Sequence, residues 1–503
     1  MRINKISIFN IIEKIINIFF LLWITIMLIG ALNSNNLFSS ENPLRKVFIS
    51  CIVALIAITI GFLKLSKWSL KPSLLEKINR KYKFYSLLSL TVIVFLLQLY
   101  FIYKANTGIG FDAGIVVSEV VNHSSISDYF RYNYFSFYPN NLLLLYTENI
   151  WGSIFGTSWL SFSFLSLICV DSFMVTTLIS MYLIDKKKLF KTWVIFLIWL
   201  SIFPYIIVPY TDTAVLPLIS TYILGYTIIK KAKKSKLKIV GCLLLGVFAT
   251  LGYLMKPTAI IPLIAIIIVE LIYYIFNRQK YNINFKAIIR FIVIIISALT
   301  VQFGYQIKTN NQHFVKLDSN LKIPAIHFIS MGMHDEGGFA QVDAGAMYSA
   351  HSSDEMTKIS KQHIKERLNK YTPYTYGVFL IHKNFNNTAD GSFGWLQEGN
   401  FIDQHPNNFI QNWVYPNGKY LNYFYDIAQV LWIVALVMLL LTKPYSENSR
   451  PYFLLFKIAL LGGFVYLLMF EGGRSRYLIQ FIPMIIPLLG LSNIPRNNKS
   501  ILK

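Results

Sequence analysis

The sequence predicts an all-α protein that crosses a lipid bilayer about twelve times, and three observations lead to this prediction. Hydrophobic residues make up 55% of the 503-residue chain and charged residues only 14%, whereas soluble domains carry roughly 25% charged residues. The mean hydropathy is +0.50. Apolar runs such as residues 84–103 reach the roughly 20 residues that a helix needs to span the hydrocarbon core. Such runs must be helical, because lipid offers no partner to an unpaired backbone group.

Each expected span is an apolar run bounded by polar or basic residues. The spans cover residues 9–31, 47–65, 84–104, 159–184, 192–209, 213–229, 238–255, 258–276, 288–306, 425–442, 452–470 and 477–491. The first run is too long for the hydrophobic region of a signal peptide and lacks a clear small-residue cleavage site. It is therefore expected to remain in the protein as a span.

The basic residues predict how these spans are oriented. The formal net charge is +23, and the lysines and arginines gather in short clusters between the apolar runs. The clusters are residues 64–83, 186–191, 230–238, 278–286, 443–450 and 496–503. Lysine and arginine favour the cytoplasmic side, next to anionic lipid headgroups. Both termini are therefore expected in the cytoplasm, and membrane lipid, not nucleic acid, is the expected partner of these charges.

All six clusters share one side only if the apolar run 141–155 does not cross the membrane. This run has about 15 residues, which is short for a span, and it contains Glu148 and Asn149. We expect a helix that lies in the outer interface or re-enters from it. A crossing here would instead place five later basic loops outside, against the positive-inside rule.

This threading divides the chain into four parts. Residues 1–83 hold two N-terminal spans and a basic loop, and residues 84–306 form a core of spans that includes the first outer loop, 105–158. Residues 307–426 form an outer cap, and residues 427–503 hold the last spans and a cytoplasmic tail. Within the cap, the Ser-x-x-Glu pattern that starts at Ser352 predicts the beginning of a helix.

The first outer loop offers a candidate catalytic carboxylate. Asp112 stands shortly after a span and is flanked by Gly110 and Gly114, which allow other groups to approach the backbone closely. A carboxylate at the membrane boundary suits a general base that acts on a sugar hydroxyl. The aromatic stretch 129–138 that follows either stacks on sugar rings or belongs to the interfacial aromatic belt.

Three cations occur where the positive-inside rule disfavours them. Lys256 occupies a short outer turn, and Arg474 and Arg476 lie between the last two expected spans. Arginine binds phosphate oxygens through its planar fork and lysine as a point charge, so these cations predict an anionic lipid-phosphate ligand. The alternative is that Asp212 pairs with Lys256, and Glu471 with an arginine, to hold helix ends together. These two interpretations do not exclude each other.

In this order the residues resemble the GT-C superfamily of membrane glycosyltransferases. The nearest branch contains protein O-mannosyltransferases and lipid A aminoarabinose transferases, with relatives in Gram-positive bacteria. The resemblance extends over about residues 84–491, and the two spans before it look like an addition. It rests on Asp112, the turn Tyr138-Pro139-Asn140-Asn141, Asp212, Lys256-Pro257 and the late segment Glu471 to Pro483.

The resemblance implies an enzyme of the bacterial plasma membrane. It would move a sugar from a polyprenyl-phosphate donor to a cell-envelope glycan, lipid or protein acceptor on the outer face. Asp112 would be the general base, and Lys256, Arg474 and Arg476 would hold the phosphate. The other implied substrate-binding residues are Asp212, Tyr138, Asn140, Glu471 and, in the cap, His327.

The resemblance is incomplete at the position where relatives carry a metal-binding Asp-x-Asp pair. Asp112 is followed by Ala-Gly, so no obligatory cofactor is expected, although a divalent cation stays open. Some relatives bind zinc through acidic and histidine side chains, but the spacing of His123 and His327 does not support such a site.

Two other functions remain open at this stage. A flippase or transporter of polyprenyl-linked glycans would also be a bundle of about a dozen helices. A polysaccharide polymerase would share the large outer loop and the outer arginines. The flippase should show ionisable groups or broken helices at the middle of the membrane, and only Asp171 is a mid-span charge in the sequence.

Overall fold

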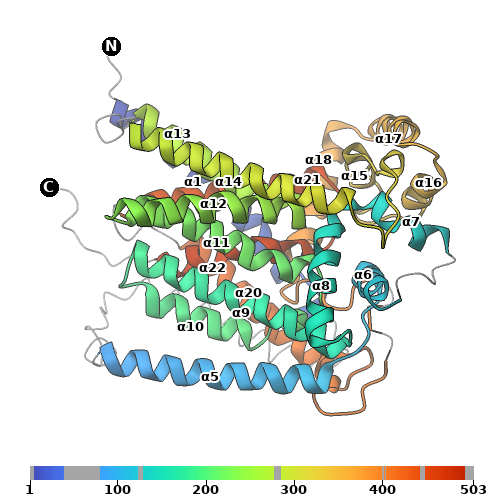
Figure 1. Ribbon diagram of the computed structural model, residues 1–503, viewed down its shortest axis with the longest axis horizontal. Coiled ribbons are helices and arrows are strands. Elements are labelled where there is room, and N and C mark those ends of the chain that lie inside the picture. Colours follow the sequence, from blue (N-terminus) through green and yellow to red (C-terminus); the bar gives the residue numbers. More distant parts are fainter. Residues whose placement is uncertain are drawn as a thin grey trace.

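The computed structural model describes residues 5–38, 80–122, 128–276, 285–398, 401–402, 404–441 and 448–492. Within these ranges every regular element is a helix, and one isolated bridge pairs Ile109 with Ile402. Long helices lie side by side as a bundle, and shorter helices cover one end of it (Figure 1). The predicted all-α membrane fold is confirmed. The expected span 47–65 falls outside the described residues.

Nine helices of the described part are long and apolar enough to cross a membrane. They correspond to the following elements: α1 (Lys5–Leu32), α5 (Arg80–Ala105), α9 (Trp159–Ile184), α11 (Thr211–Lys231), α12 (Ser235–Met255), α13 (Ile260–Phe276) with the 3-10 turn before it, α14 (Phe285–Asn310), α20 (Leu421–Leu440) and α21 (Arg450–Met469). Each coincides with an expected span. The expected spans and the observed helices agree because a membrane-spanning helix needs about 20 apolar residues whatever it packs against.

One expected span is an interrupted helix in the structure, and another changes from a 3-10 helix to an α-helix without a gap. The run 192–209 consists of α10 (Leu189–Leu200), an irregular stretch and the 3-10 turn η2 (Pro204–Ile207). The run 477–491 consists of the 3-10 segment η6 (Ser475–Phe481) followed by α22 (Ile482–Leu491). Proline removes a backbone donor and blocks a regular α-helix. Pro204 stands at the break in the first run, and Pro483 stands in the first turn of α22, where the 3-10 helix ends. The irregular backbone at 203–208 is buried, as non-helical backbone at membrane depth must be.

The run 141–155 forms the helix α8 (Leu142–Phe155), which runs across the long helices instead of along them (Figure 1). Its neighbours are α6 (Phe111–Asn122) and the cap-side ends of α9 and α12. It is too short to count among the candidate spans of the described residues. This is the arrangement expected for an interfacial helix.

The cap is built from the segment between α14 and α20. Its helices are α15 (Ala325–Met331), α16 (Gln341–Ser349), α17 (Ser353–Leu368) and α18 (Pro373–Thr388), together with the short elements η5 (Ser319–Leu321) and α19 (Gln411–Val414). The short elements elsewhere in the chain are α2 (Asn35–Phe38), α7 (Tyr129–Phe137), η1 (Pro139–Asn141) and η3 (Pro257–Ala259). The Ser352 hydroxyl accepts a hydrogen bond from the Glu355 amide at 3.2 Å, which confirms the predicted start of α17. Buried Lys383 of α18 donates to the carbonyls of Leu468 and Phe470 at 3.0 and 2.7 Å. The cap is therefore joined to the end of α21.

The described basic clusters lie at the end of the bundle opposite the cap. There Lys191 Nζ donates to the Leu489 carbonyl at 2.7 Å, and Lys231 Nζ donates to the Asn448 carbonyl at 3.2 Å. Arg450 pairs with Glu13 of α1 at the same end. The described parts of the loops predicted to be cytoplasmic thus share one end, called the basic end below, and the described parts of the predicted outer loops share the other, called the cap end.

Helices α11 and α12 make the most extensive helix pair of the bundle through close backbone contact. A Cβ atom on Gly241 of α12 would come within 2.7 Å of the Gly225 carbonyl of α11. Small residues allow this approach, which is how membrane helices gain van der Waals contact without a hydrophobic driving force. The pair positions the cap-side ends of both helices, where the candidate site begins.

We expect Gly241→Val to push α11 and α12 apart and to lower the free energy of unfolding by about 1–3 kcal/mol, the usual cost of overpacking. The thermal unfolding midpoint of the purified protein in detergent measures this effect. Gly304→Val in α14 is the matched control, because a Cβ there meets no atom within 4 Å. Equal midpoints for both variants would contradict the close contact.

Candidate functional site

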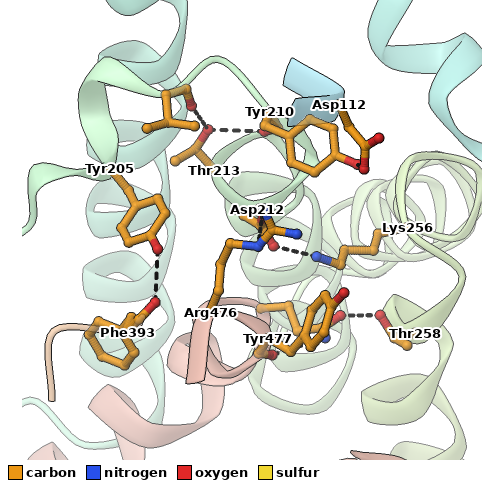
Figure 2. A network of polar contacts seen from close by, with 12 residues as sticks. Asp112, Tyr205, Tyr210, Asp212, Thr213, Lys256, Thr258, Phe393, Arg476 and Tyr477 are labelled. Carbon is orange, nitrogen blue, oxygen red and sulfur yellow. Dashed lines mark hydrogen bonds and ion pairs between the residues drawn. The ribbon is translucent and has the colours of Figure 1, made fainter. Parts of the chain in front are cut away.

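Four chain segments meet at the cap end and bring ionisable side chains together. Asp112 comes from the first turn of α6, Asp212 from the first turn of α11, Lys256 from the turn between α12 and η3, and Arg476 from η6. Figure 2 shows the side chains of Asp212, Lys256 and Arg476 pointing toward one another, with Asp112 and Tyr210 beside them. Neighbouring ionisable members of this set are at least 44 positions apart in the chain, and they meet because their helices end at the same level.

Asp212 is the centre of this charged cluster. Its Oδ1 accepts a hydrogen bond from Lys256 Nζ, and its Oδ2 lies 3.6 Å from Arg476 Nε. The side chains of Asp212 and Arg476 are 2% and 5% exposed, so the attraction acts in a medium of low dielectric constant. Burial lowers the pKa of Lys256, and the neighbouring Asp212 carboxylate partly offsets that effect. The predicted Asp212–Lys256 ion pair is confirmed.

Glu398 joins the two arginines. Arg474 Nη1 donates to Glu398 Oε2, and Arg476 Nη1 lies 3.3 Å from Glu398 Oε1. The Glu398 side chain is 8% exposed. Sequence reasoning missed this residue, because a single glutamate in a long polar loop has no spacing that marks it.

Hydrogen bonds from α18 hold the backbone of the arginine-bearing loop. Asn387 Oδ1 accepts from the Gly473 amide at 2.6 Å, and Asn387 Nδ2 donates to the Leu467 carbonyl at 3.0 Å. The Ser475 hydroxyl donates to the Asn386 carbonyl at 3.2 Å. The position of both guanidinium groups therefore depends on the cap.

Asp112 lies in a buried polar environment. Tyr210 donates its hydroxyl hydrogen to Asp112 Oδ2 at 3.1 Å, and Tyr134 also hydrogen-bonds the carboxyl group. Burial raises the pKa of Asp112, while Arg476 and the two tyrosine hydrogen bonds oppose the rise. A carboxylate with a raised pKa is a stronger base, which favours proton abstraction from a neutral hydroxyl.

Phe111, next to Asp112, has a strained backbone. Its φ angle is 46°, which is uncommon for a bulky residue and costs of order 1–3 kcal/mol. The strain places the ring 4.8 Å from the Arg476 guanidinium carbon, within range of a cation–π interaction. A backbone hydrogen bond from Gly110 to the Phe401 carbonyl at 3.0 Å stabilises this conformation. Strain of this kind often occurs at functional sites.

Tyrosines line the side of the site nearest the cap. The hydroxyls of Tyr138 and Tyr348 are 2.9 Å apart, and Tyr348 comes from α16. Burial raises the pKa of Tyr138 well above its usual range, so its hydroxyl stays protonated at neutral pH. Tyr477 donates to Glu471 Oε1 at 3.0 Å, and burial raises the pKa of Glu471 although Arg474 opposes this. Tyr348 carried no signal in the sequence.

His327 lies inside the cap with a different set of partners. The groups that act on its charge are Asp343, Arg367 and His363, and Arg367 Nη2 donates to Asp343 Oδ1 at 2.6 Å. Burial lowers the pKa of His327 to about 4. The structure thus places His327 in a network that stabilises the cap, apart from the charged cluster.

Asn140 lies at the turn into α8, where its Nδ2 donates to Asn141 Oδ1 at 3.2 Å. Its neighbour Asn141 has the closer link to the site, because Asn141 Nδ2 donates to the hydroxyl of Tyr134. His123 falls outside the described residues. Asp171, the mid-span charge of the sequence, accepts a hydrogen bond from Gln98 inside the bundle at 3.3 Å. Among the residues that the structure describes, no three His, Cys, Asp or Glu side chains are placed to hold a metal ion.

A family described as conserved hypothetical integral membrane proteins matches residues 8–495. The chain belongs to this family. The crystal structure of ArnT from Cupriavidus metallidurans bound to undecaprenyl phosphate matches over 80% of this chain and 76% of that chain, with 12% identity and a TM-score of 0.35. At that TM-score the likeness transfers no residue role or ligand to this protein. No curated protein matches the sequence.

The depressed pKa of His327 predicts acid sensitivity of the cap. Below pH 6.5 the unfolded chain binds a proton at this histidine and the folded chain does not, so stability falls as the pH drops from 6.5 to about 4. By linkage this loss amounts to about 3 kcal/mol at most. Thermal midpoints measured from pH 7 to pH 4 should fall more steeply for the wild type than for His327→Gln. Parallel pH profiles would show that His327 is not the titrating group.

Proposed function

We propose that this protein is a membrane glycosyltransferase of the GT-C type, which transfers a sugar from a polyprenyl-phosphate carrier to an acceptor hydroxyl on the outer face of the membrane. The observation that carries the proposal is that one buried site contains both a candidate base and candidate phosphate-binding cations. The positive charge of Arg476 acts on the Asp112 carboxyl group and opposes the rise of its pKa. Asp112 also accepts a hydrogen bond from Tyr210. Arg476 in turn neighbours Asp212 and Lys256.

The proposed reaction uses these groups in one displacement. Asp112 takes the proton from the acceptor hydroxyl as its oxygen attacks the anomeric carbon. The bond between that carbon and the phosphate oxygen breaks, and polyprenyl phosphate leaves with the electron pair. Lys256, Arg474 and Arg476 stabilise the negative charge that grows on the phosphate. Attack opposite to the leaving group inverts the anomeric configuration.

Unsatisfied donors support the phosphate-binding part of the proposal. Arg476 is 4% exposed, yet its Nε and Nη1 have no hydrogen-bond partner among the described residues. Leaving a buried donor unsatisfied costs about 1–3 kcal/mol, and more for a charged group. A phosphate oxygen would satisfy these donors with charge-assisted bonds. Because side-chain cations can supply the positive charge, we expect no obligatory divalent metal.

The cap and its tyrosines suit recognition of a hydroxylated acceptor. Tyr138 and Tyr348 present an aromatic surface and hydroxyl groups near Asp112 and Glu471. Aromatic rings can pack on sugar faces while hydroxyls bind polar edges. The acceptor classes consistent with an outer site are cell-envelope glycans, lipids and proteins.

A flippase of polyprenyl-linked glycans is the second candidate, because transporters commonly contain interrupted helices. The break after α10 is of this kind. However, α10 has 12 residues, about 18 Å at 1.5 Å per residue, and the chain beyond the break leads to the charged cluster at the cap end. This interruption therefore fits delivery of Asp212 to a site at one membrane face. A polymerase remains the third candidate.

The proposal predicts that Asp112→Asn loses at least about 100-fold in transfer rate, the lower end of what a general base contributes. Release of polyprenyl phosphate from a labelled polyprenyl-phosphate sugar measures this rate. Because the pKa of Asp112 is raised, the wild-type rate should fall on acidification at a pH above the usual titration range of aspartate. Unimpaired release by a folded Asp112→Asn protein would remove the base assignment, whereas no release by the wild type would favour a flippase.

The outer location of the site predicts which positions a membrane-impermeant maleimide labels in intact cells. In a variant with Cys51, Cys169 and Cys242 replaced by serine, Ser353→Cys at the start of α17 should be labelled. Lys233→Cys at the basic end should be labelled only after the cells are permeabilised. The reverse pattern would place the site in the cytoplasm and exclude transfer on the outer face.

A further inference from the structure

Glu398 holds the position that an anionic ligand of the two arginines would take. Its carboxylate presents one oxygen to Arg474 Nη1 and the other to Arg476 Nη1. A phosphate group binds arginine pairs through oxygens in the same bridging manner. The side chain is 8% exposed, so the three groups form one buried arrangement.

This arrangement leaves Arg476 incompletely bound. Its Nε is 3.6 Å from Asp212 Oδ2 and its Nη1 is 3.3 Å from Glu398 Oε1, and in the described part of the chain neither nitrogen makes a hydrogen bond. Asp212 Oδ2 also lacks one there. Glu398 therefore neutralises Arg476 without satisfying it. A ligand with more acceptor oxygens would bind these donors better.

The backbone before Glu398 is strained and is held by side-chain hydrogen bonds. Tyr205 donates to the Phe393 carbonyl at 2.8 Å (Figure 2), and the buried Trp395 indole donates to the Val414 carbonyl at 2.7 Å. Phe393 and Leu396 have φ angles of 59° and 64°, left-handed conformations that cost free energy. Gln397 is the last anchored residue, because its Nε2 donates to Asp390 Oδ2 at 3.1 Å. Glu398 follows it, so its side chain can leave the arginines without breaking these hydrogen bonds.

The charges of the site also favour a phosphate that replaces the Glu398 carboxylate over one that binds beside it. The carboxyl groups of Asp112, Asp212, Glu398 and Glu471 surround Lys256, Arg474 and Arg476. A phosphate added beside all four carboxyl groups would meet strong repulsion in a medium of low dielectric constant. Replacing the Glu398 carboxylate by a phosphate keeps the local charge nearly constant.

We propose that Glu398 is a displaceable occupant of the arginine pair, which the phosphate of the donor lipid expels when it binds. This inference rests on the proposed function for the identity of the lipid. It makes Glu398 a specificity-determining residue, because only a ligand that binds the arginines better than a carboxylate can enter. A neutral or weakly accepting headgroup leaves Glu398 in place.

The test is direct binding of farnesyl phosphate to the full-length protein in detergent, with farnesol as the neutral control ligand. Glu398→Gln keeps the size of the side chain and removes its charge, so we expect it to bind farnesyl phosphate at least about tenfold more tightly than the wild type. Arg476→Ala should bind more weakly. Glu336→Gln in the cap is the matched control, since Glu336 contacts Asn386 and not the arginines, and its affinity should equal that of the wild type.

Each outcome separates the inference from the proposed function. If the wild type binds in an Arg476-dependent manner and Glu398→Gln binds equally or more weakly, Glu398 only positions the arginines and the inference is rejected while the proposed function stands. If Glu398→Gln binds tightly and the wild type does not, the inference is supported. If no variant distinguishes farnesyl phosphate from farnesol, the arginines bind no phosphate and both proposals fail. Thermal midpoints close to that of the wild type show that each variant is folded.

Discussion

The contact among Asp212, Lys256 and Arg476 is the interaction on which the rest of the cap end depends. These three charges are almost removed from water, and the cost of burying each one is offset only while the others stay close. The ends of α11, α12 and η6 must therefore remain at the same level. Asp212 also lies in the first turn of α11, where the helix dipole stabilises a carboxylate. The site is consequently organised before any ligand enters it.

An interrupted span helps to explain how a lipid-embedded bundle carries such charges. A continuous helix would extend regular backbone to the membrane surface and leave only side chains to approach the centre. The break at Pro204 instead leads the chain through buried irregular backbone to Tyr210, while Arg476 reaches the cluster at the start of the helical segment formed by η6 and α22. The surrounding protein provides partners for the backbone N–H and C=O groups that non-helical backbone leaves without intrahelical hydrogen bonds. The cap then covers this end and supplies Glu398 and Tyr348.

Local strain and incomplete hydrogen bonding coincide at the same place. Phe111 and Leu396 have left-handed backbone conformations, and Arg476 has unsatisfied donors within the described structure. A site that only stabilised helix ends would be expected to satisfy its buried donors, since leaving them unpaired costs free energy. The unsatisfied donors of the buried Arg476 guanidinium, beside the strained Phe111, are better explained by a ligand that completes the arrangement. A general base beside a phosphate-binding group is the chemistry that such a ligand would undergo.

The sequence by itself determined the membrane fold, the position of the nine long spans of the described residues and the residues Asp112, Asp212, Lys256 and Arg476 as candidates. Hydropathy and the positions of lysine and arginine are local signals, and the bilayer imposes them whatever the helices pack against. Only the tertiary structure decided that Glu398 bridges the arginines, that Tyr348 joins the site and that His327 does not. Glu398 and Arg474 are 76 positions apart, and no periodicity relates them. Which distant side chains contact each other depends on where the helices end and how the chain turns between them. The pattern of apolar and basic residues in the sequence does not specify this.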